Sequence, residues 1–304
     1  MTVPEIFIVG APKAGTTSLA SWLAQHPDVY FSVPKEPFFW AADYPRLRKH
    51  YGFDTLESYE ALFTSPGARE AHVRAEGSTV YLYSERAVPD IMANTVHPRF
   101  IVALREPVDL LVAYHRTQLV ALNESEPDFA VAWRRSLIGI GPDTTPLDQK
   151  LVDYPRVGRL GAALERLLSI TPSEDVHVVY LDDIKTEPER AWYELMGFLE
   201  LDSRVLPDLR VRNASDKMFR SLALRHLTHR PPRLLDAPVR RIRQWSRTTD
   251  TTWVARAKQS MWRPESKPSI SADLRSEVAG VLRADVALLS ELTKKDLSDW
   301  VKSA

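Results

Sequence analysis

Short apolar runs alternate along the chain with longer stretches in which apolar residues recur at steps of three and four. Five short runs begin at Ile6, Asp28, Arg74, Arg99 and Val176. Helical periodicity is plainest in three stretches that begin at Val157, Pro188 and Ala272. Such alternation is typical of parallel strands joined by crossover helices. The sequence therefore predicts an α/β fold in three layers, with a central parallel sheet of about five strands flanked by helices.

No internal repeat and no long linker divides the 304 residues, so the pattern predicts a single domain over residues 1–304. One stretch differs in composition. Residues 209–268 contain five prolines and about fifteen basic residues against four acidic ones. We expect short helices and irregular chain in this basic segment, covering a binding site.

Basic and acidic residues number 40 each, so no overall field attracts nucleic acid or an anionic membrane. The absence of cysteine excludes disulfides, thiolate metal sites and a cysteine nucleophile, and it fits a reducing compartment. No apolar run reaches the roughly 18 residues of a membrane span, and no basic leader precedes the first strand. These features predict a soluble, cytoplasmic protein without a nucleic acid partner, and they leave its oligomeric state open.

The first strand leads into "FIVGAPKAGTTSLASWL", which is almost a Walker phosphate loop. Gly10 and Gly15 have the expected spacing, but Thr16 stands where the Walker lysine belongs. Lys13 lies inside the turn instead, and no strand-end aspartate completes a magnesium site. A strand, a glycine turn and a helix start direct backbone N–H groups at one anion. The loop therefore suits a single 5′-phosphate, with Lys13 near a leaving oxygen; the alternative is an ordinary turn with a solvated lysine.

Four segments carry a family resemblance. "PKAGTTSL" resembles the 5′-phosphosulfate loop of sulfotransferases that use 3′-phosphoadenosine 5′-phosphosulfate (PAPS), and "KEPFFW" is similar to the K-E-P-x-F-F segment of their carbohydrate branch. "EGSTVYLYS" resembles the substrate-side strand and loop, and "RFIVALREPVDLLVAYH" the 3′-phosphate strand and helix. The resemblance continues to residue 300 and implies the P-loop-type fold of a bacterial-like soluble member.

The resemblance implies transfer of a sulfuryl group from PAPS to a hydroxyl of a small-molecule, glycan or glycolipid acceptor. Adenosine 3′,5′-bisphosphate (PAP) leaves, and no metal is required. Lys13 stabilises the leaving group and Glu36 is the base that takes the acceptor proton. The implied donor contacts of the loop are Pro12, Lys13, Ala14, Gly15, Thr16, Thr17 and Ser18. The implied acceptor contacts are Lys35, Phe38, Tyr81 and Tyr83. Without the resemblance, Glu36 is better interpreted as the partner of Lys35 on an exposed turn.

Arg105 follows a predicted strand, where ligands meet an open α/β sheet. The resemblance makes it a 3′-phosphate contact. The sequence departs from the family pattern at this subsite, because Ala113 replaces a serine and Leu110 replaces a second arginine. The cations that could compensate are His115, Arg116, Arg212 and Lys217. Of these, we predict that Arg212 and Lys217 contact PAPS. His115 also remains an alternative to Glu36 as the base.

Two other functions stay open. A non-catalytic member that binds a nucleotide or a partner is compatible with the loss at Ala113 and Leu110. A P-loop kinase requires a Walker lysine and a magnesium ligand, which we do not find in the sequence. The sequence does not specify the acceptor.

Overall fold

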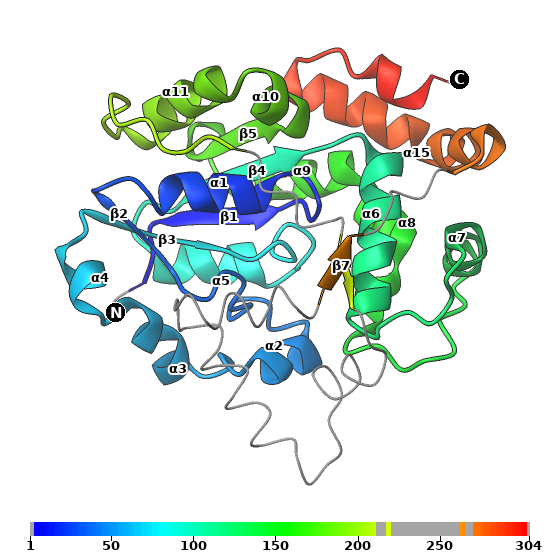
Figure 1. Ribbon diagram of the computed structural model, residues 1–304, viewed down its shortest axis with the longest axis horizontal. Coiled ribbons are helices and arrows are strands. Elements are labelled where there is room, and N and C mark those ends of the chain that lie inside the picture. The colour runs from blue at the N-terminus through cyan, green and yellow to red at the C-terminus, as the bar shows by residue number, and fades with distance from the viewer. Residues whose placement is uncertain (1–2, 211–216, 220–261, 265–269, 303–304) are drawn as a thin grey trace, which may run out of the picture.

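The computed structural model describes residues 3–210, 217–219, 262–264 and 270–302. Its main sheet has five strands in the order β2-β3-β1-β4-β5, and every neighbouring pair is parallel (Figure 1). The strands are β1 (Ile6–Gly10), β2 (Val29–Phe31), β3 (Val73–Gly77), β4 (Arg99–Leu104) and β5 (Val176–Tyr180). The predicted fold class is therefore confirmed, and each strand lies in one of the five apolar runs.

Helices cover the sheet and bury its central strands on both faces (Figure 1). The helices before β5 are α1 (Thr16–Leu23), α2 (Pro45–Tyr51), α3 (Leu56–Glu60), α4 (Pro66–Glu70), α5 (Ala87–Asn94), α6 (Pro107–Val120), α7 (Phe129–Leu137), α8 (Tyr154–Gly158) and α9 (Leu160–Leu168). Those after it are α10 (Leu181–Thr186), α11 (Pro188–Leu199) and α15 (Ala272–Thr293). All residues of β1 are buried, which explains why its sequence is continuously apolar rather than alternating.

The single helix predicted from Val157 is in fact two helices. Arg159, with φ −80° and ψ 74°, is not helical and separates α8 from α9. The break lets α9 begin against α15, where the Asp285 carboxylate accepts hydrogen bonds from the backbone N–H groups of Gly161 (2.8 Å) and Ala162 (2.9 Å). Tertiary packing therefore overrides a helical periodicity that is otherwise correct.

Within the basic segment, β6 (Lys217–Phe219) and β7 (Trp262–Pro264) form an antiparallel pair. Residues 211–216, 220–261 and 265–269, which include Arg212, lie outside the described residues, so the covering role of this segment stays a prediction. The buried apolar side chains between Val3 and Val301 form one core cluster, and the interpretation of residues 1–304 as one domain stays a prediction. None of the described helices combines the length and apolar content that a bilayer-spanning segment needs.

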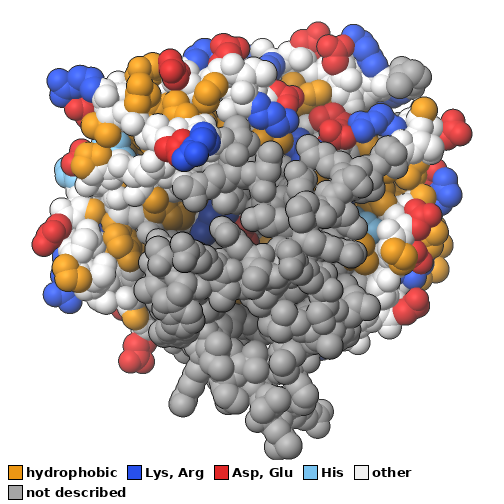
Figure 2. All heavy atoms as spheres, in the orientation of Figure 1, with side chains coloured by type: hydrophobic (Ala, Val, Ile, Leu, Met, Phe, Trp, Pro, Cys, Tyr) orange, Lys and Arg blue, Asp and Glu red, His pale blue; other side chains and the backbone are white. Residues whose placement is uncertain are grey.

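Charged side chains of both signs are interspersed over the described part of the face in Figure 2. This distribution agrees with the equal numbers of basic and acidic residues in the sequence. A binding site for an anion on this protein must therefore be built locally.

Gly161 marks the closest approach between α9 and α15. A Cβ atom added there would lie 2.3 Å from the carbonyl oxygen of Asp285 and 3.1 Å from the backbone nitrogen of Leu289. Only a residue without a side chain allows this contact, because backbone atoms cannot move aside as a flexible side chain can.

We expect Gly161→Ala to lower the free energy of unfolding by roughly 1–3 kcal/mol, because the added methyl group pushes the two helices apart. Gly280, inside α15, is the matched control, since nothing lies within 4 Å of a Cβ added there. Gly280→Ala should raise stability by about 0.5–1 kcal/mol through helix propensity. Denaturant unfolding of both variants tests this pair. Equal effects of the two substitutions would contradict the close approach.

Candidate active site

The loop between β1 and α1 forms an anion cradle. Gly15 precedes α1 in the left-handed region with φ 95°, and no side chain caps the helix. The first amide groups of α1 and the positive end of its dipole therefore point into the space in front of the loop. A Cβ at Gly15 would lie 3.0 Å from both Leu181 and Ile184 side chains, so α10 closes the cradle from the other side.

A cavity of about 330 Å³ lies in front of this cradle. Most of the predicted site residues line it, namely Pro12, Lys13, Gly15, Thr16, Thr17, Ser18, Glu36, Phe38 and Arg105. Residues that the sequence did not single out include Thr79, Asp109 and Lys185. Ala14 is fully buried within the loop and does not reach the cavity.

Three residues that line the cavity have strained backbones. Lys13 (φ 63°), Glu36 (φ 68°) and Phe38 (φ 61°) all lie in the left-handed region, which residues other than glycine rarely adopt. Each such conformation costs on the order of 1 kcal/mol and persists only when the surroundings fix it. The concentration of strain around one cavity is typical of a functional site.

Lys35 joins the cradle to the predicted base. Its ammonium group lies 3.0 Å from Glu36 Oε1 and donates a hydrogen bond to Thr16 Oγ1 at 3.4 Å. Thr79 Oγ1 donates to the same Glu36 oxygen at 3.3 Å. The ion pair between Lys35 and Glu36, which the sequence suggested as an alternative role for Glu36, is therefore present. It is not on an exposed turn, however, because the two side chains are only 19% and 30% exposed.

A buried carboxylate lies beneath the segment that carries Glu36. Glu76, at the end of β3, has no exposed surface. Its Oε1 accepts hydrogen bonds from the hydroxyls of Tyr59 (3.0 Å) and Tyr81 (2.9 Å), and its Oε2 accepts one from Ser78 (3.0 Å). Burial raises the pKa of Glu76 to about 7, although these hydrogen bonds and the charge of Lys35 oppose the shift.

The same three hydroxyls hold the segment after Glu36. Ser78 Oγ accepts the backbone N–H of Phe38 at 3.1 Å. The backbone N–H and the indole N–H of Trp40 donate to Tyr81 (3.2 Å) and to Tyr59 (2.9 Å), respectively. The Glu76 network therefore fixes the strained chain on either side of Phe38 and positions Glu36 at the cavity wall.

The prediction that Tyr81 and Tyr83 contact the acceptor is wrong for this structure. Tyr81 is fully buried and bonded to Glu76, while Tyr83 is 4% exposed and donates to the carbonyl oxygen of Val157 at 2.9 Å. Burial raises the pKa of both phenols above 10.0. Neither lines the cavity, because the chain turns after Gly77 and the alternation expected of a strand does not continue.

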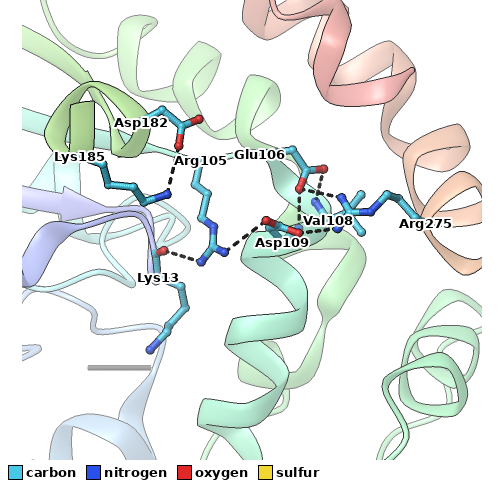
Figure 3. A network of polar contacts seen from close by, with 8 residues as sticks. All are labelled: Lys13, Arg105, Glu106, Val108, Asp109, Asp182, Lys185 and Arg275. Atoms are coloured by element: carbon cyan, nitrogen blue, oxygen red, sulfur yellow. Dashed lines mark hydrogen bonds and ion pairs between the residues drawn. The ribbon is translucent and has the colours of Figure 1, made fainter. Parts of the chain in front are cut away.

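Arg105 lies at the end of β4 and is held from two sides (Figure 3). Its Nη1 donates to the backbone carbonyl of Lys13 at 3.2 Å, and its Nη2 lies 3.5 Å from Asp109 Oδ2. Arg275 of α15 donates to Asp109 Oδ1 at 2.6 Å and to Glu106 Oε2 at 3.3 Å. Sequence reasoning missed Arg275, because 170 residues separate it from Arg105 and no motif surrounds it.

Asp109 and Arg275 set the charge around Arg105. Partial burial alone would raise the pKa of Asp109, but the hydrogen bond from Arg275 and the charge of Arg105 lower it below 3.8. Asp109 is therefore an anion that lines the cavity beside a predicted phosphate contact. Arg275 offsets this negative charge from behind.

The structure also distinguishes among the cations proposed to compensate at this subsite. Leu110 is fully buried, so the position of the lost arginine faces the core, whereas Ala113 lines the cavity. His115 is 2% exposed, bonds to the carbonyl oxygen of Glu126 at 2.8 Å and does not line the cavity. Burial lowers the pKa of His115, which favours a neutral ring. Arg116 does line the cavity.

Lys185 of α10 is a cavity cation that the sequence did not reveal. It forms an ion pair with Asp182 at 3.1 Å (Figure 3), and it lines the cavity as Arg105 does. Arg212 and the side chain of Lys217 lie outside the described part of the chain. Among the described residues, no group of three carboxylate or imidazole side chains is placed to hold a metal ion, and a metal-free reaction stays a prediction.

Comparison with known proteins agrees with this site. Residues 4–96, which include the cradle, Glu36 and Glu76, match the model of the sulfotransferase family. The chain is 26% identical over 256 residues to heparan sulfate glucosamine 3-O-sulfotransferase 6 of Homo sapiens, covering 80% of this chain and 69% of that protein. It is 24% identical over 203 residues to bifunctional heparan sulfate N-deacetylase/N-sulfotransferase 1 of Mus musculus, covering 66% of this chain but 22% of that protein.

A solved sulfotransferase from Alicyclobacillus acidocaldarius has the same fold, with a TM-score of 0.69, 22% identity and 99% of each chain covered. The chain is therefore similar to sulfotransferases in residues 4–96, in its match to these relatives and in its fold.

The raised pKa of Glu76 predicts a pH-dependent stability. Between pH 4.5 and about 7 the unfolded chain releases this proton while the folded chain keeps it, so stability falls as pH rises. The loss totals roughly 3 kcal/mol and levels off above the folded pKa. Glu76→Gln should abolish this component in denaturant unfolding at a series of pH values. The exposed control Glu57→Gln should retain this component. If the free energy of unfolding varied with pH in the same way in wild type and Glu76→Gln, Glu76 would not be its source.

Proposed function

We propose that the chain transfers a sulfuryl group from PAPS to an acceptor hydroxyl, with Lys13 and Glu36 as its catalytic residues. The proposal rests on the observation that both residues line one cavity. Lys35 connects the loop that carries Lys13 with Glu36 through hydrogen bonds. The Lys35 ammonium group bonds both Thr16 of the cradle and Glu36. An acceptor oxygen beside Glu36 therefore faces a group held in the cradle.

The cradle is the proposed site of the 5′-phosphosulfate. The amide groups at the start of α1 and the hydroxyls of Thr16, Thr17 and Ser18 provide donors to its oxygens. The sulfur–oxygen bond to the phosphate breaks, and the bridging oxygen keeps the electron pair. Lys13 stabilises the charge that develops there, and such preorganised electrostatic stabilisation supplies a large part of many enzymatic accelerations.

Arg105 is the proposed 3′-phosphate contact, with Lys185 as a second cation on the cavity wall. This arrangement supports PAPS as donor and PAP as product. Arg212 and Lys217 stay proposed contacts that lie outside the described side chains.

Glu36 is the proposed general base. It takes the proton of the acceptor hydroxyl while the acceptor oxygen forms a bond to sulfur. Lys35 and Thr79 both bond its Oε1, which fixes the carboxylate orientation at the wall. The acceptor comes from the class of small molecules and glycans, and the heparan sulfate relatives support a glycan as one candidate.

A non-catalytic, nucleotide-binding role is the second candidate, because Ala113 lines the 3′-phosphate subsite without a hydroxyl. A kinase is disfavoured by Thr16 at the Walker lysine position. The absence of cysteine supports the further proposal that the enzyme works in the cytoplasm.

We expect Lys13→Ala and Glu36→Gln each to lower the turnover number by at least about 100-fold, the usual scale for loss of an electrostatic contact or a base. The measurement is transfer of radiolabelled sulfate from PAPS to a panel of phenols, alcohols and oligosaccharides. Exposed Lys49→Ala and Glu57→Gln are the charge-matched controls. Rates near wild type in both cavity variants would overturn the roles assigned to these residues.

The same assay tests the reaction class. A chelator such as EDTA should leave sulfate transfer unchanged, and PAP should raise the melting temperature of wild type and of Glu36→Gln. Magnesium-dependent transfer of a γ-phosphate would overturn the proposal. PAP binding without sulfate transfer to any acceptor would favour the non-catalytic role.

Arg275→Gln should weaken PAP binding about tenfold, or about 1.4 kcal/mol, although Arg275 does not line the cavity. Without Arg275, the Asp109 carboxylate competes with the 3′-phosphate for Arg105. Adding Asp109→Asn should restore affinity to within about threefold, and calorimetric titration measures this coupling. Exposed Arg283→Gln on the same helix is the control. A double variant as weak as Arg275→Gln would contradict the compensating role.

A further inference from the structure

Helix α6 lines the cavity along most of its length, and we describe the cavity as two halves along this helix. It begins next to Arg105 and rises about 1.5 Å per residue, so Gln118 lies about 13 Å along the axis from Asp109. Both residues line the cavity. The half near Asp109 holds Lys13, Arg105 and Lys185, and it is the donor half of the proposed function. We call the half around Gln118 the acceptor half.

The described walls of the acceptor half are mostly apolar. Phe38, which follows Glu36 by two residues, packs against Tyr51 with ring centroids 4.7 Å apart and an interplanar angle of 52°. Leu47, Ala121 and Leu151 complete these walls. Among the described lining residues of this half, Glu36 and Arg116 are the charged ones. An acceptor that carries several sulfates would lose hydration here without gaining matching cations from these walls.

Gln118 gives this half a hydrogen-bond donor of fixed orientation. The backbone N–H of Leu147 donates to Asn123 at 2.9 Å, and since an N–H only donates, the atom facing it must be the Asn123 oxygen. The Asn123 amide nitrogen therefore donates to Gln118 Oε1 at 2.9 Å. Gln118 must then turn its amide nitrogen toward the cavity, where no described residue accepts from it.

We propose that the acceptor is an uncharged phenol or alcohol with a flat apolar body and a second, neutral oxygen. The hydroxyl lies at Glu36, the body packs on Phe38 and Tyr51, and the second oxygen accepts a hydrogen bond from Gln118. This inference rests on the proposed sulfuryl transfer and selects the acceptor class within it. A sulfated glycan is the alternative that the test must separate.

A matched acceptor pair tests the inference. 7-Hydroxycoumarin has a phenol at one end and a neutral carbonyl at the other, whereas 2-naphthol has a similar bicyclic shape without the carbonyl. With PAPS as donor, kcat/KM for both should exceed that of an N-sulfated heparan hexasaccharide by at least about 100-fold. The coumarin should exceed the naphthol by about fivefold or more, since the site would otherwise leave a buried donor unpaired.

Gln118→Met removes the donor and keeps the length of the side chain. It should bring the coumarin-to-naphthol ratio close to one, whereas a merely structural defect would slow both acceptors alike. Exposed Gln25→Glu should keep the wild-type ratio. A ratio unchanged in Gln118→Met overturns the role of Gln118.

No transfer to either phenol overturns the acceptor class, whatever the hexasaccharide does. The melting-temperature shift with PAP then tells the two failures apart. A retained shift together with transfer to the hexasaccharide leaves the proposed function intact, whereas loss of both the shift and all transfer removes the proposed function itself.

Discussion

The central position of β1 in the parallel sheet is the constraint on which the site depends. Its neighbours are β3 and β4, so the loop after β1 meets the ends of both strands. From β4 comes Arg105, which bonds the carbonyl of Lys13. From the end of β3 come Glu76 and, just beyond it, Thr79, which holds Glu36. Because parallel strands end at one edge, groups separated by about 100 residues meet without any long connection.

This arrangement needs a polar core beneath it. The Glu76 carboxylate is an unfavourable group to bury, and burial is the main cause of its raised pKa. In return, its three hydroxyl partners hold Phe38 and Trp40 through directional hydrogen bonds. An apolar core of equal volume could pack as well but could not fix a strained backbone in one conformation. Burying Glu76 lowers the stability of the fold, and the hydrogen-bond network around it keeps Glu36 in a single position.

The sequence was informative where structure is local. The apolar runs predicted all five strands, and the glycine spacing placed Lys13, Gly15 and Thr16 in one loop, since turn chemistry is encoded by neighbours. It failed where tertiary packing decides. The break at Arg159 depends on Asp285 of a distant helix. Tyr81 and Tyr83 were assigned to the wrong environment because the chain leaves the sheet at Gly77, and Arg275 reaches the site from a helix without any motif.

The two halves of the cavity suit the proposed transfer of a sulfuryl group from an anionic donor by a protein of zero net charge. Lys13, Arg105 and Lys185 line the proposed donor side together with Asp109, whose charge Arg275 balances from outside the cavity. The acceptor side presents mostly apolar surface. In the proposed reaction, negative charge moves from the acceptor oxygen toward the donor phosphate, past the Lys35–Glu36 ion pair. Apolar walls would lower the local dielectric there, so one ammonium group at Lys13 would stabilise the departing oxygen more than it would in water.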